Sequence, residues 1–263
     1  MKNKLFIVLL LFVLFIFCVV VYNIRYIENY ENDTIPKNIF QTWHTKNLPP
    51  KMQNCVNELT HRNPEFKFYL YDDNDCREFI QNNYDSDILY AFDNLKPGAY
   101  KADLWRYCIL YKYGGIYLDI KYQSVNKFKF IQLTDKEYFV KDANYDSNDD
   151  LIKQKNGIYN ALIICKAKNE IIFKCITDIV DNVKNKFYGY HPLEVTGPLL
   201  LKKYIDSNAR TLSHAIENNN YYIIDSNNTK ILKMYNGYFE ERHNYQKNKH
   251  YGDLWKERDI YIL

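Results

Sequence analysis

The chain has 263 residues, enough for one catalytic domain and a short appendage. Its formal net charge of +3 and the lack of any lysine- and arginine-rich block argue against a nucleic-acid-binding protein. Of the six cysteines, one lies in an apolar N-terminal run and the other five are widely spaced without a C-x-x-C pair. This spacing argues against a structural zinc site. One disulfide remains possible if the part of the chain after the apolar run lies in the lumen of the secretory pathway.

The N-terminal run at residues 5–22 contains no charged residue. As a helix rising about 1.5 Å per residue it would span about 27 Å, close to the hydrocarbon core of a bilayer. Lys2 and Lys4 precede the run and only Arg25 follows it, which favours a cytosolic N-terminus and a lumenal or external body. A cleaved signal peptide is the alternative, but the run is longer than usual for one and lacks a small-residue cleavage site.

The expected organisation follows from this run and from the polar stretch behind it. We expect a short tail and a transmembrane signal anchor over residues 1–25, a stem over 26–34, and one catalytic domain over 35–263. The chain would then be a single-pass type II membrane protein whose body faces the lumen of the endoplasmic reticulum or Golgi.

The catalytic domain opens with alternating strand and helix patterns. Residues 38–42 predict a first strand, with Trp43 at its end. Pro49 and Pro50 start a helix that runs through His61.

A second strand and helix follow. Residues 66–71 predict the strand, and the pair Asp72 and Asp73 stands at its end as an N-cap for a helix over 74–83. Capping accounts for one of these two aspartates and leaves the role of the other open.

The most informative stretch runs from Pro97 to Lys121. Pro97 suits the first turn of a helix that continues to Tyr113, where Gly114 and Gly115 end it. The short apolar run at residues 116–118 predicts a buried strand, and Asp119 follows at its end, where open α/β sheets place ligand chemistry.

The helix within this stretch carries its own polar face. Asp103, Arg106 and Tyr107 stand at i, i+3 and i+4, so they share one side of the helix. If the strand continues past Asp119, the side chains of Asp119 and Lys121 also point to one side.

The second half of the chain has a looser pattern. Short strands are predicted at residues 138–140 and 158–164, with Asn160 as the polar interior residue of the latter. An amphipathic helix is predicted over 171–186, and a Thr-Gly-Pro turn precedes another over 199–207.

Three segments together resemble glycosyltransferase family 32, a group of sugar transferases with a D-x-D motif. They are I-P-K-N-I-F-Q-T-W at 35–43, F-Y-L-Y-D-D-N-D-C-R-E-F-I at 68–80, and P-G-A-Y-K-A-D-L-W-R-Y with Y-G-G-I-Y-L-D at 97–119. His250 and Trp255 resemble the H-x-x-x-x-W ending of the same family. The resemblance implies an α/β fold of the GT-A nucleotide-diphospho-sugar transferase type, with a Rossmann-like mixed sheet.

The resemblance also implies roles for individual residues. It makes Asp103 and Asp119 catalytic candidates. Lys121 is a third candidate because its ammonium could neutralise phosphate charge. The resemblance assigns donor binding to Gln41, Thr42, Trp43, Arg106, Tyr107, Asn160 and Trp255.

The chain departs from the family at the metal-binding motif, because it reads Asp119-Ile120-Lys121 where the family has a second aspartate. Two arrangements follow. In one, Asp119 and His250 hold a manganese or magnesium ion. In the other, the ammonium of Lys121 takes the place of the ion and neutralises phosphate charge directly.

The resulting expectation is a membrane-anchored, retaining glycosyltransferase. It would move a mannose-like or glucose-like hexose from a nucleotide-sugar donor to a glycan or lipid-linked acceptor. A glycosyltransferase fold that has lost catalysis and serves as a sugar-binding or scaffolding protein is the alternative. A nucleotide-sugar hydrolase would differ only by admitting water in place of the acceptor.

Overall fold

The computed structural model describes residues 14–21, 34–143, 157–206, 210–246 and 248–262. Residues 1–34 and 35–263 form separate compact units. Of the predicted membrane helix at 5–22, only 14–21 are described, and they are helical with mostly exposed apolar side chains. Within the described residues, no helix is both long and apolar enough to cross a bilayer. The predicted tail and most of the predicted stem lie outside the described residues.

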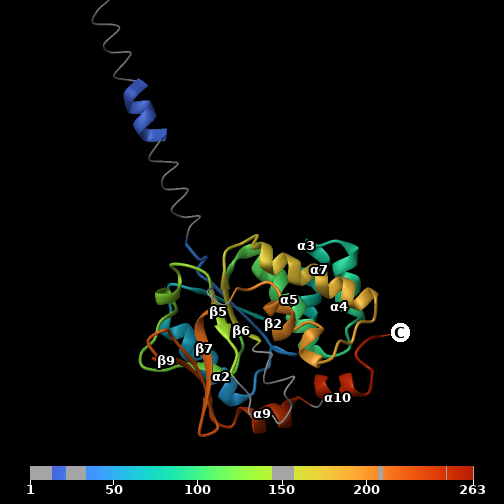
Figure 1. Ribbon diagram of the computed structural model, residues 1–263. Coiled ribbons are helices and arrows are strands. Elements are labelled where there is room, and N and C mark those ends of the chain that lie inside the picture. Colours follow the sequence, from blue (N-terminus) through green and yellow to red (C-terminus); the bar gives the residue numbers. More distant parts are fainter. Residues whose placement is uncertain (1–13, 22–33, 144–156, 207–209, 247, 263) are drawn as a thin grey trace, which may run out of the picture. The chain divides into compact units, whose positions relative to one another are not determined.

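In the unit that begins at Ile35, the described residues form a mixed sheet of nine strands flanked by helices, which confirms the predicted α/β class (Figure 1). The strands lie in the order β2-β1-β3-β6-β5-β7-β8-β9-β4. Their bounds are β1 Asn38–Thr42, β2 Lys67–Tyr71, β3 Gly115–Leu118, β4 Tyr122–Ser124, β5 Tyr138–Lys141, β6 Ile158–Cys165, β7 Arg210–Glu217, β8 Asn220–Ile224 and β9 Lys230–Met234.

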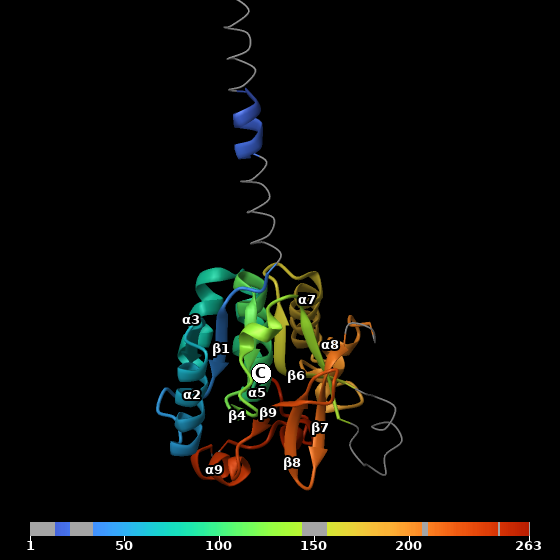
Figure 2. The same cartoon turned by 90° about the vertical axis from the view of Figure 1, so that its left-hand side faces the viewer.

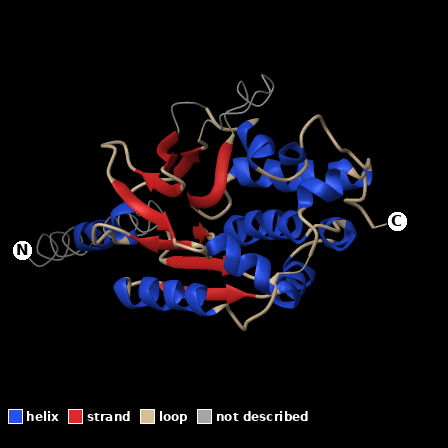
Figure 3. Cartoon of the chain, turned by 90° about the horizontal axis from the view of Figure 1, so that it is seen from below, coloured by secondary structure: helices blue, strands red, loops and turns tan. Residues whose placement is uncertain are grey.

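The helices come mainly from the first two-thirds of this unit. Their bounds are α2 Pro50–Arg62, α3 Asp73–Asn83, α4 Ser86–Asn94, α5 Gly98–Tyr113, α7 Glu170–Lys184, α8 Pro198–Lys202, α9 Tyr238–Tyr245 and α10 Tyr251–Lys256. Two 3₁₀ turns, η1 at Phe130–Leu133 and η2 at Pro192–Glu194, complete the described elements. Figure 3 shows the helices flanking the strands.

The sheet has two halves of different character. In the first half, β1 runs parallel to both β2 and β3, so the carboxyl ends of these strands lie at one edge. In the second half, β7, β8 and β9 form an antiparallel meander, and β4 pairs with β9.

The connection from β3 to β4 forces these two halves together. Only residues 119–121 separate the two strands, yet β4 lies at the far edge of the sheet beside β9. The sheet therefore curls so that the meander comes back to the carboxyl end of β3 (Figure 2). The turn at 119–121 lies where the two halves meet.

Helix α5 is the central helix of the fold, and its two ends follow from its sequence. Pro97 stands at its N-cap, and Gly114 ends it with φ of +61°. A Cβ atom at Gly114 would lie 2.5 Å from the backbone nitrogen of Ala167, so close packing of the backbone also requires glycine there. The helix is buried almost all round, which is expected of a helix in a core.

Several predicted elements are confirmed with small shifts at their ends. The predicted strand at 38–42 and the predicted helix from Pro50 are observed. Asp72 is the N-cap of α3, in a reciprocal capping box with Asp75. The predicted helix over 199–207 is wrong in length, because α8 ends at Lys202.

The strand does not continue past Asp119, so the condition under which Asp119 and Lys121 would share one face of it is not met. β3 ends at Leu118 and the chain turns, with the backbone N–H of Tyr122 donating to the carbonyl of Asp119. The disulfide left open by the sequence is absent, since all six cysteines lie in the described part of the chain and are unpaired.

Candidate active site

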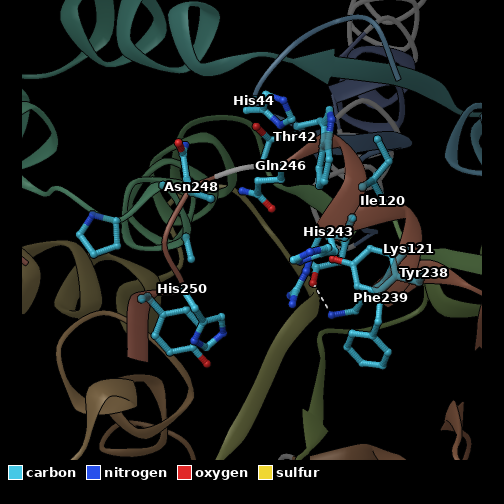
Figure 4. Close-up of a pocket in the computed structure, with 18 of the residues that line it drawn as sticks. Thr42, His44, Ile120, Lys121, Tyr238, Phe239, His243, Gln246, Asn248 and His250 are labelled. Atoms are coloured by element: carbon cyan, nitrogen blue, oxygen red, sulfur yellow. Dashed lines mark hydrogen bonds and ion pairs between the residues drawn. The ribbon is translucent and has the colours of Figure 1, made fainter. Parts of the chain in front are cut away.

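A pocket of about 1080 Å³ opens where the two halves of the sheet meet (Figure 4). One wall comes from the carboxyl ends of the parallel strands, with residues 42–44 after β1 and residues 119–121 after β3. The opposite wall comes from Tyr221 of β8 and from residues of the segment 238–253. Ligand sites of α/β proteins commonly lie at the carboxyl ends of parallel strands, and this volume is sufficient for a nucleotide sugar.

The turn at 119–121 places two opposite charges in this pocket. The Nζ of Lys121 donates to Oδ2 of Asp119 at 2.7 Å, and this pair is marked by the dashed line in Figure 4. The side chains are 16% and 23% exposed, respectively, so both are largely shielded from water. Ion pairs in such surroundings are screened much less than those on the surface.

The other carboxylate oxygen of Asp119 is held from the sheet and from α5. The hydroxyl of Tyr117 donates to Oδ1 at 2.7 Å, and a guanidinium nitrogen of Arg106 lies 3.8 Å away. Burial works to raise the pKa of Asp119, but the charges of Lys121 and Arg106 outweigh it and hold that pKa below its ordinary value. Asp119 is therefore ionised at neutral pH.

Three aromatic rings surround the ammonium of Lys121. Its Nζ lies 5.6 Å from the ring centre of Tyr122, 5.3 Å from that of Tyr159 and 5.9 Å from that of Tyr238. Ring faces attract cations at this range. Burial opposes the charge, yet the carboxylate of Asp119 and the neighbouring tyrosines raise the pKa of Lys121 above its ordinary value, so it stays charged.

Asp103 lies beneath this pair and is not among the residues that line the pocket. Its oxygens accept from the amide of Asn160 at 2.8 Å and from the hydroxyl of Thr196 at 2.7 Å, and Arg106 lies at 3.3 Å. Burial raises the pKa of Asp103 to about 6 despite these partners. Asp103 and Arg106 thus lie on one face of α5, as the sequence predicts. Together with Asn160 and Thr196 they form a buried network of hydrogen bonds and ion pairs.

Arg106 joins this network to the pocket. Its guanidinium donates to the backbone carbonyl of Asn160 at 2.7 Å and lies 4.2 Å from the ring centre of Tyr117. The side chain is 8% exposed and still forms part of the pocket wall. One buried cation therefore supports both Asp103 and Asp119.

The remaining predicted site residues divide into two groups. Thr42, Trp43 and His250 line the pocket, whereas Gln41, Tyr107, Asn160 and Trp255 do not. Trp43 is 8% exposed, and its indole N–H has no partner among the described residues. Trp255 donates its indole N–H to the carbonyl of Tyr188 at 2.6 Å and so anchors the C-terminal segment.

The described residues do not fit a metal site built on Asp119 and His250. Both oxygens of Asp119 are already bonded to donors of the same chain, one of them a cation. In Figure 4, His250 and Lys121 lie on opposite sides of the pocket. The Nδ1 of His250 accepts a hydrogen bond from the backbone N–H of Gly252. Throughout the part of the chain that the structure describes, no group of three His, Cys, Asp or Glu side chains is placed to hold an ion.

Some pocket residues were not identified from the sequence. Asp73, whose role the capping pattern left open, lines the pocket beside His44, and burial raises its pKa. Tyr238 and Phe239 come from α9, and His214 and Tyr221 from the meander. No local motif marks these four residues, because they reach the site only through the curl of the sheet.

Comparison with known proteins assigns the first half of the body. Residues 49–156 match the family described as "Glycosyltransferase sugar-binding region containing DXD motif". The match is to a sugar-binding region and covers less than half of the chain. At the position of the DXD motif this chain has Asp119-Ile120-Lys121, and the matched segment contains α5, β3 and the turn that carries the ion pair.

The relatives are fungal and viral. The chain is 39% identical over 100 residues to inositol phosphoceramide mannosyltransferase 3 of Schizosaccharomyces pombe, covering 38% of this chain and 28% of that protein. It is 33% identical over 96 residues to the initiation-specific alpha-1,6-mannosyltransferase of Candida albicans, covering 34% and 25%. It is 35% identical over 88 residues to an uncharacterized glycosyltransferase of Acanthamoeba polyphaga mimivirus, covering 33% and 35%.

These matches are confined to part of each protein. The chain spans about a quarter to a third of the length of these curated relatives. Among solved structures, the PaToxG glycosyltransferase aligns with a TM-score of 0.49 at 19% identity, covering 65% of this chain and 69% of that one.

Proposed function

We propose that the chain is a retaining hexosyltransferase of GT-A fold. It moves a mannose-like or glucose-like hexose from a nucleotide-sugar donor to a hydroxyl of a glycan or glycolipid acceptor. The observation that carries the proposal is the Asp119–Lys121 pair, held over Arg106 in a pocket at the carboxyl ends of β1 and β3. The mannosyltransferase relatives support the hexose class.

The charges of the pocket match the chemistry of transfer. As the bond between the sugar and the diphosphate breaks, negative charge develops on the departing phosphate, and a fixed cation lowers the barrier. The ammonium of Lys121 lines the pocket and is held in place by Asp119 and by three tyrosine rings. We assign Lys121 to the diphosphate, and we assign the base to Trp43, which lines the pocket at the end of β1.

Lys121 takes the role of the divalent ion in this proposal. A dication at that position would be repelled by the ammonium at about 4 kcal/mol per unit charge, for a separation of about 4 Å and an effective dielectric near 20. The lysine would have to leave its carboxylate and its three rings before the ion entered. We therefore expect transfer that does not depend on manganese or magnesium.

A donor screen tests the proposal. The purified chain is incubated with GDP-mannose, UDP-glucose and related donors, with manganese or with EDTA, and release of nucleoside diphosphate is followed. We expect turnover that persists in EDTA and that Lys121→Ala abolishes. Lys121→Asp should make the residual turnover depend on manganese. Lys184→Ala is the matched control, because Lys184 pairs with Asp87 outside the pocket wall.

Complete loss of wild-type turnover in EDTA, restored by manganese, would contradict the metal-free arrangement and favour Asp119 with His250 as ligands. Absence of turnover with every donor, together with binding of one of them, would favour the second candidate. That candidate is a sugar-binding or scaffolding protein, and one observation favours it: both Asp119 oxygens are bonded within the chain.

Membrane anchoring is a separate part of the proposal. The uncharged run at 5–22 and the lysines before it support a signal anchor with the body in the lumen. Protease added to sealed microsomes should leave the body intact and degrade it after detergent is added. Degradation without detergent would reverse the proposed orientation.

A further inference from the structure

His214 of β7 lies in the wall of the same pocket in an arrangement that the proposed donor chemistry does not use. It is 5% exposed, and its Nδ1 lies 3.0 Å from Oδ1 of Asp142, just after β5. Its ring stacks on Tyr159 with centres 4.0 Å apart and planes 9° apart. The rings of His214 and Tyr221 are also stacked, with centres 6.0 Å apart and planes 21° apart. The imidazole is therefore fixed in both position and orientation.

Asp142 also decides which nitrogen carries the proton. A carboxylate accepts hydrogen bonds, so the contact with Asp142 requires the proton on Nδ1 and leaves a lone pair on Nε2 of the neutral ring. That Nε2 is buried and has no hydrogen-bond partner among the described residues. Buried polar atoms are nearly always paired, so an unpaired one in a pocket wall indicates a missing partner.

The position of His214 relates it to the proposed donor site. The ring of Tyr159 contacts both groups, because its centre lies 5.3 Å from Nζ of Lys121 and 4.0 Å from the ring centre of His214. One aromatic ring thus separates the fixed cation from the unpaired nitrogen. Tyr159 is itself hydrogen-bonded through its hydroxyl to that of Tyr122, which fixes this spacing.

We propose that His214 is the acceptor-binding residue of the pocket, where Nε2 accepts a hydrogen bond from a hydroxyl of a sugar ring. The inference rests on the proposed hexosyl transfer, for which it names the acceptor subsite. Asp142 is a positioning residue that fixes the tautomer. Tyr221 and Phe239, with ring centres 5.6 Å apart, supply apolar faces for the sugar. Because Nε2 is buried, binding requires a change in the side chains that cover it.

The decisive variant is His214→Asn. Its amide N–H can replace Nδ1–H toward Asp142, but nothing replaces Nε2. We expect the acceptor KM to rise about tenfold or more, the loss typical of one hydrogen bond to a buried group. Transfer should fall relative to donor hydrolysis by water, because only transfer uses the acceptor. His61→Asn, at an exposed position of α2, is the matched control.

A second measurement tests whether Asp142 fixes the tautomer of His214 or only packs against its ring. The ¹⁵N signals of the His214 ring should show the Nδ1–H tautomer in the wild type and a mixture of tautomers in Asp142→Asn. The Nε2 signal should move on addition of methyl α-D-mannopyranoside and not on addition of donor alone. If only dodecyl α-D-mannopyranoside shifts it, the acceptor is a lipid headgroup, whereas a response to both indicates a free glycan end.

The outcomes separate this inference from the proposed function. An unchanged acceptor KM in His214→Asn, or an equal fall of transfer and hydrolysis with a lower unfolding midpoint, overturns the acceptor subsite. If the wild type binds and hydrolyses no nucleotide sugar but the mannosides still shift the Nε2 signal, the subsite stands and the transferase proposal fails. If the mannosides shift no signal, the subsite is overturned whatever the donor result.

Discussion

The network around Asp103 and the pair formed by Asp119 and Lys121 share one cation, Arg106, but they differ in what they leave free. Every oxygen contact of Asp103 is to the chain itself, and Asp103 lies outside the pocket wall. Asp119 and Lys121 lie in the wall, and the ammonium has ring faces rather than a second carboxylate on its other sides. Asp103 is therefore enclosed by the chain, whereas the pair of Asp119 and Lys121 lies in the pocket wall.

The two carboxylates also differ in the direction of their pKa shifts. Burial raises the pKa of Asp103 to about 6. For Asp119, burial is outweighed by Lys121 and Arg106, and its pKa is lowered. Two carboxylates on different elements, α5 and the turn after β3, contact the same buried guanidinium and respond oppositely because only Asp119 has a second cation.

The largest expected effect comes from opening the buried network. Asp103→Ala leaves Arg106 without its nearest carboxylate and Thr196 without its acceptor. We expect the free energy of unfolding to fall by about 3 to 5 kcal/mol, as when one partner of a buried ion pair is removed. Urea unfolding followed by circular dichroism measures it. Asp87→Ala, which removes an exposed partner of Lys184, should cost under about 1 kcal/mol. Equal losses would show that Asp103 is not a structural centre.

The pH dependence of stability distinguishes the two carboxylates. The folded state holds the Asp103 proton more tightly than the unfolded state, since its pKa is raised from 3.8 to about 6. The stabilisation is full below about pH 4 and is lost as the pH rises through 6, at most about 3 kcal/mol. Asp119 has the opposite effect on the free energy of unfolding. Its lowered pKa stabilises the folded state above about pH 4, and this stabilisation is lost as the pH falls further.

Urea titrations between pH 4 and 7 on the wild type and on Asp103→Asn measure this difference, because the other titrating groups contribute to both proteins. We expect the wild type to lose stability relative to the variant as the pH rises. Parallel curves would mean that Asp103 stays ionised over the whole range.

Asp119→Asn tests the pocket side of the comparison. The amide keeps the volume but removes the charge that holds Lys121, so we expect transfer to fall on the order of a hundredfold. Arg106 keeps Asp103, and Lys121 lines the pocket, so we expect the unfolding midpoint to fall by less than in Asp103→Ala. Initial rates with saturating donor measure the loss, with Asp93→Asn on the surface as control. Near-normal turnover would remove Asp119 from the site.

The smallest expected effect comes from Tyr117→Phe. It removes the hydroxyl that donates to Asp119 at 2.7 Å and keeps the ring that lies under Arg106. One hydrogen bond to a charged group corresponds to about a tenfold change in rate. Rates of the single variant and of its combination with Asp119→Asn form a double-mutant cycle. Additive losses would show that the hydroxyl does not act through Asp119.

Local patterns determined much of the parallel half of the fold. Pro97 and Gly114 delimit α5, Asp72 caps α3, and the short apolar run places Asp119 at the end of a buried strand. Each of these features depends on backbone geometry or burial within one turn or strand, so neighbouring residues suffice to predict it.

The antiparallel half was decided by tertiary structure. The strands β7, β8 and β9 acquire their buried faces only by pairing with one another and with β4. The sequence also left the role of Lys121 open. Its ammonium could either repel a metal ion held by Asp119 and His250 or take the place of that ion.

The three rings around the ammonium of Lys121 come from β4, β6 and α9, which are brought together by the curl of the sheet. The unpaired nitrogen of His214 has the same origin. Sequence spacing fixes which residues share a helix or a strand, but contacts between distant segments depend on how the sheet closes, and that is a property of the whole chain.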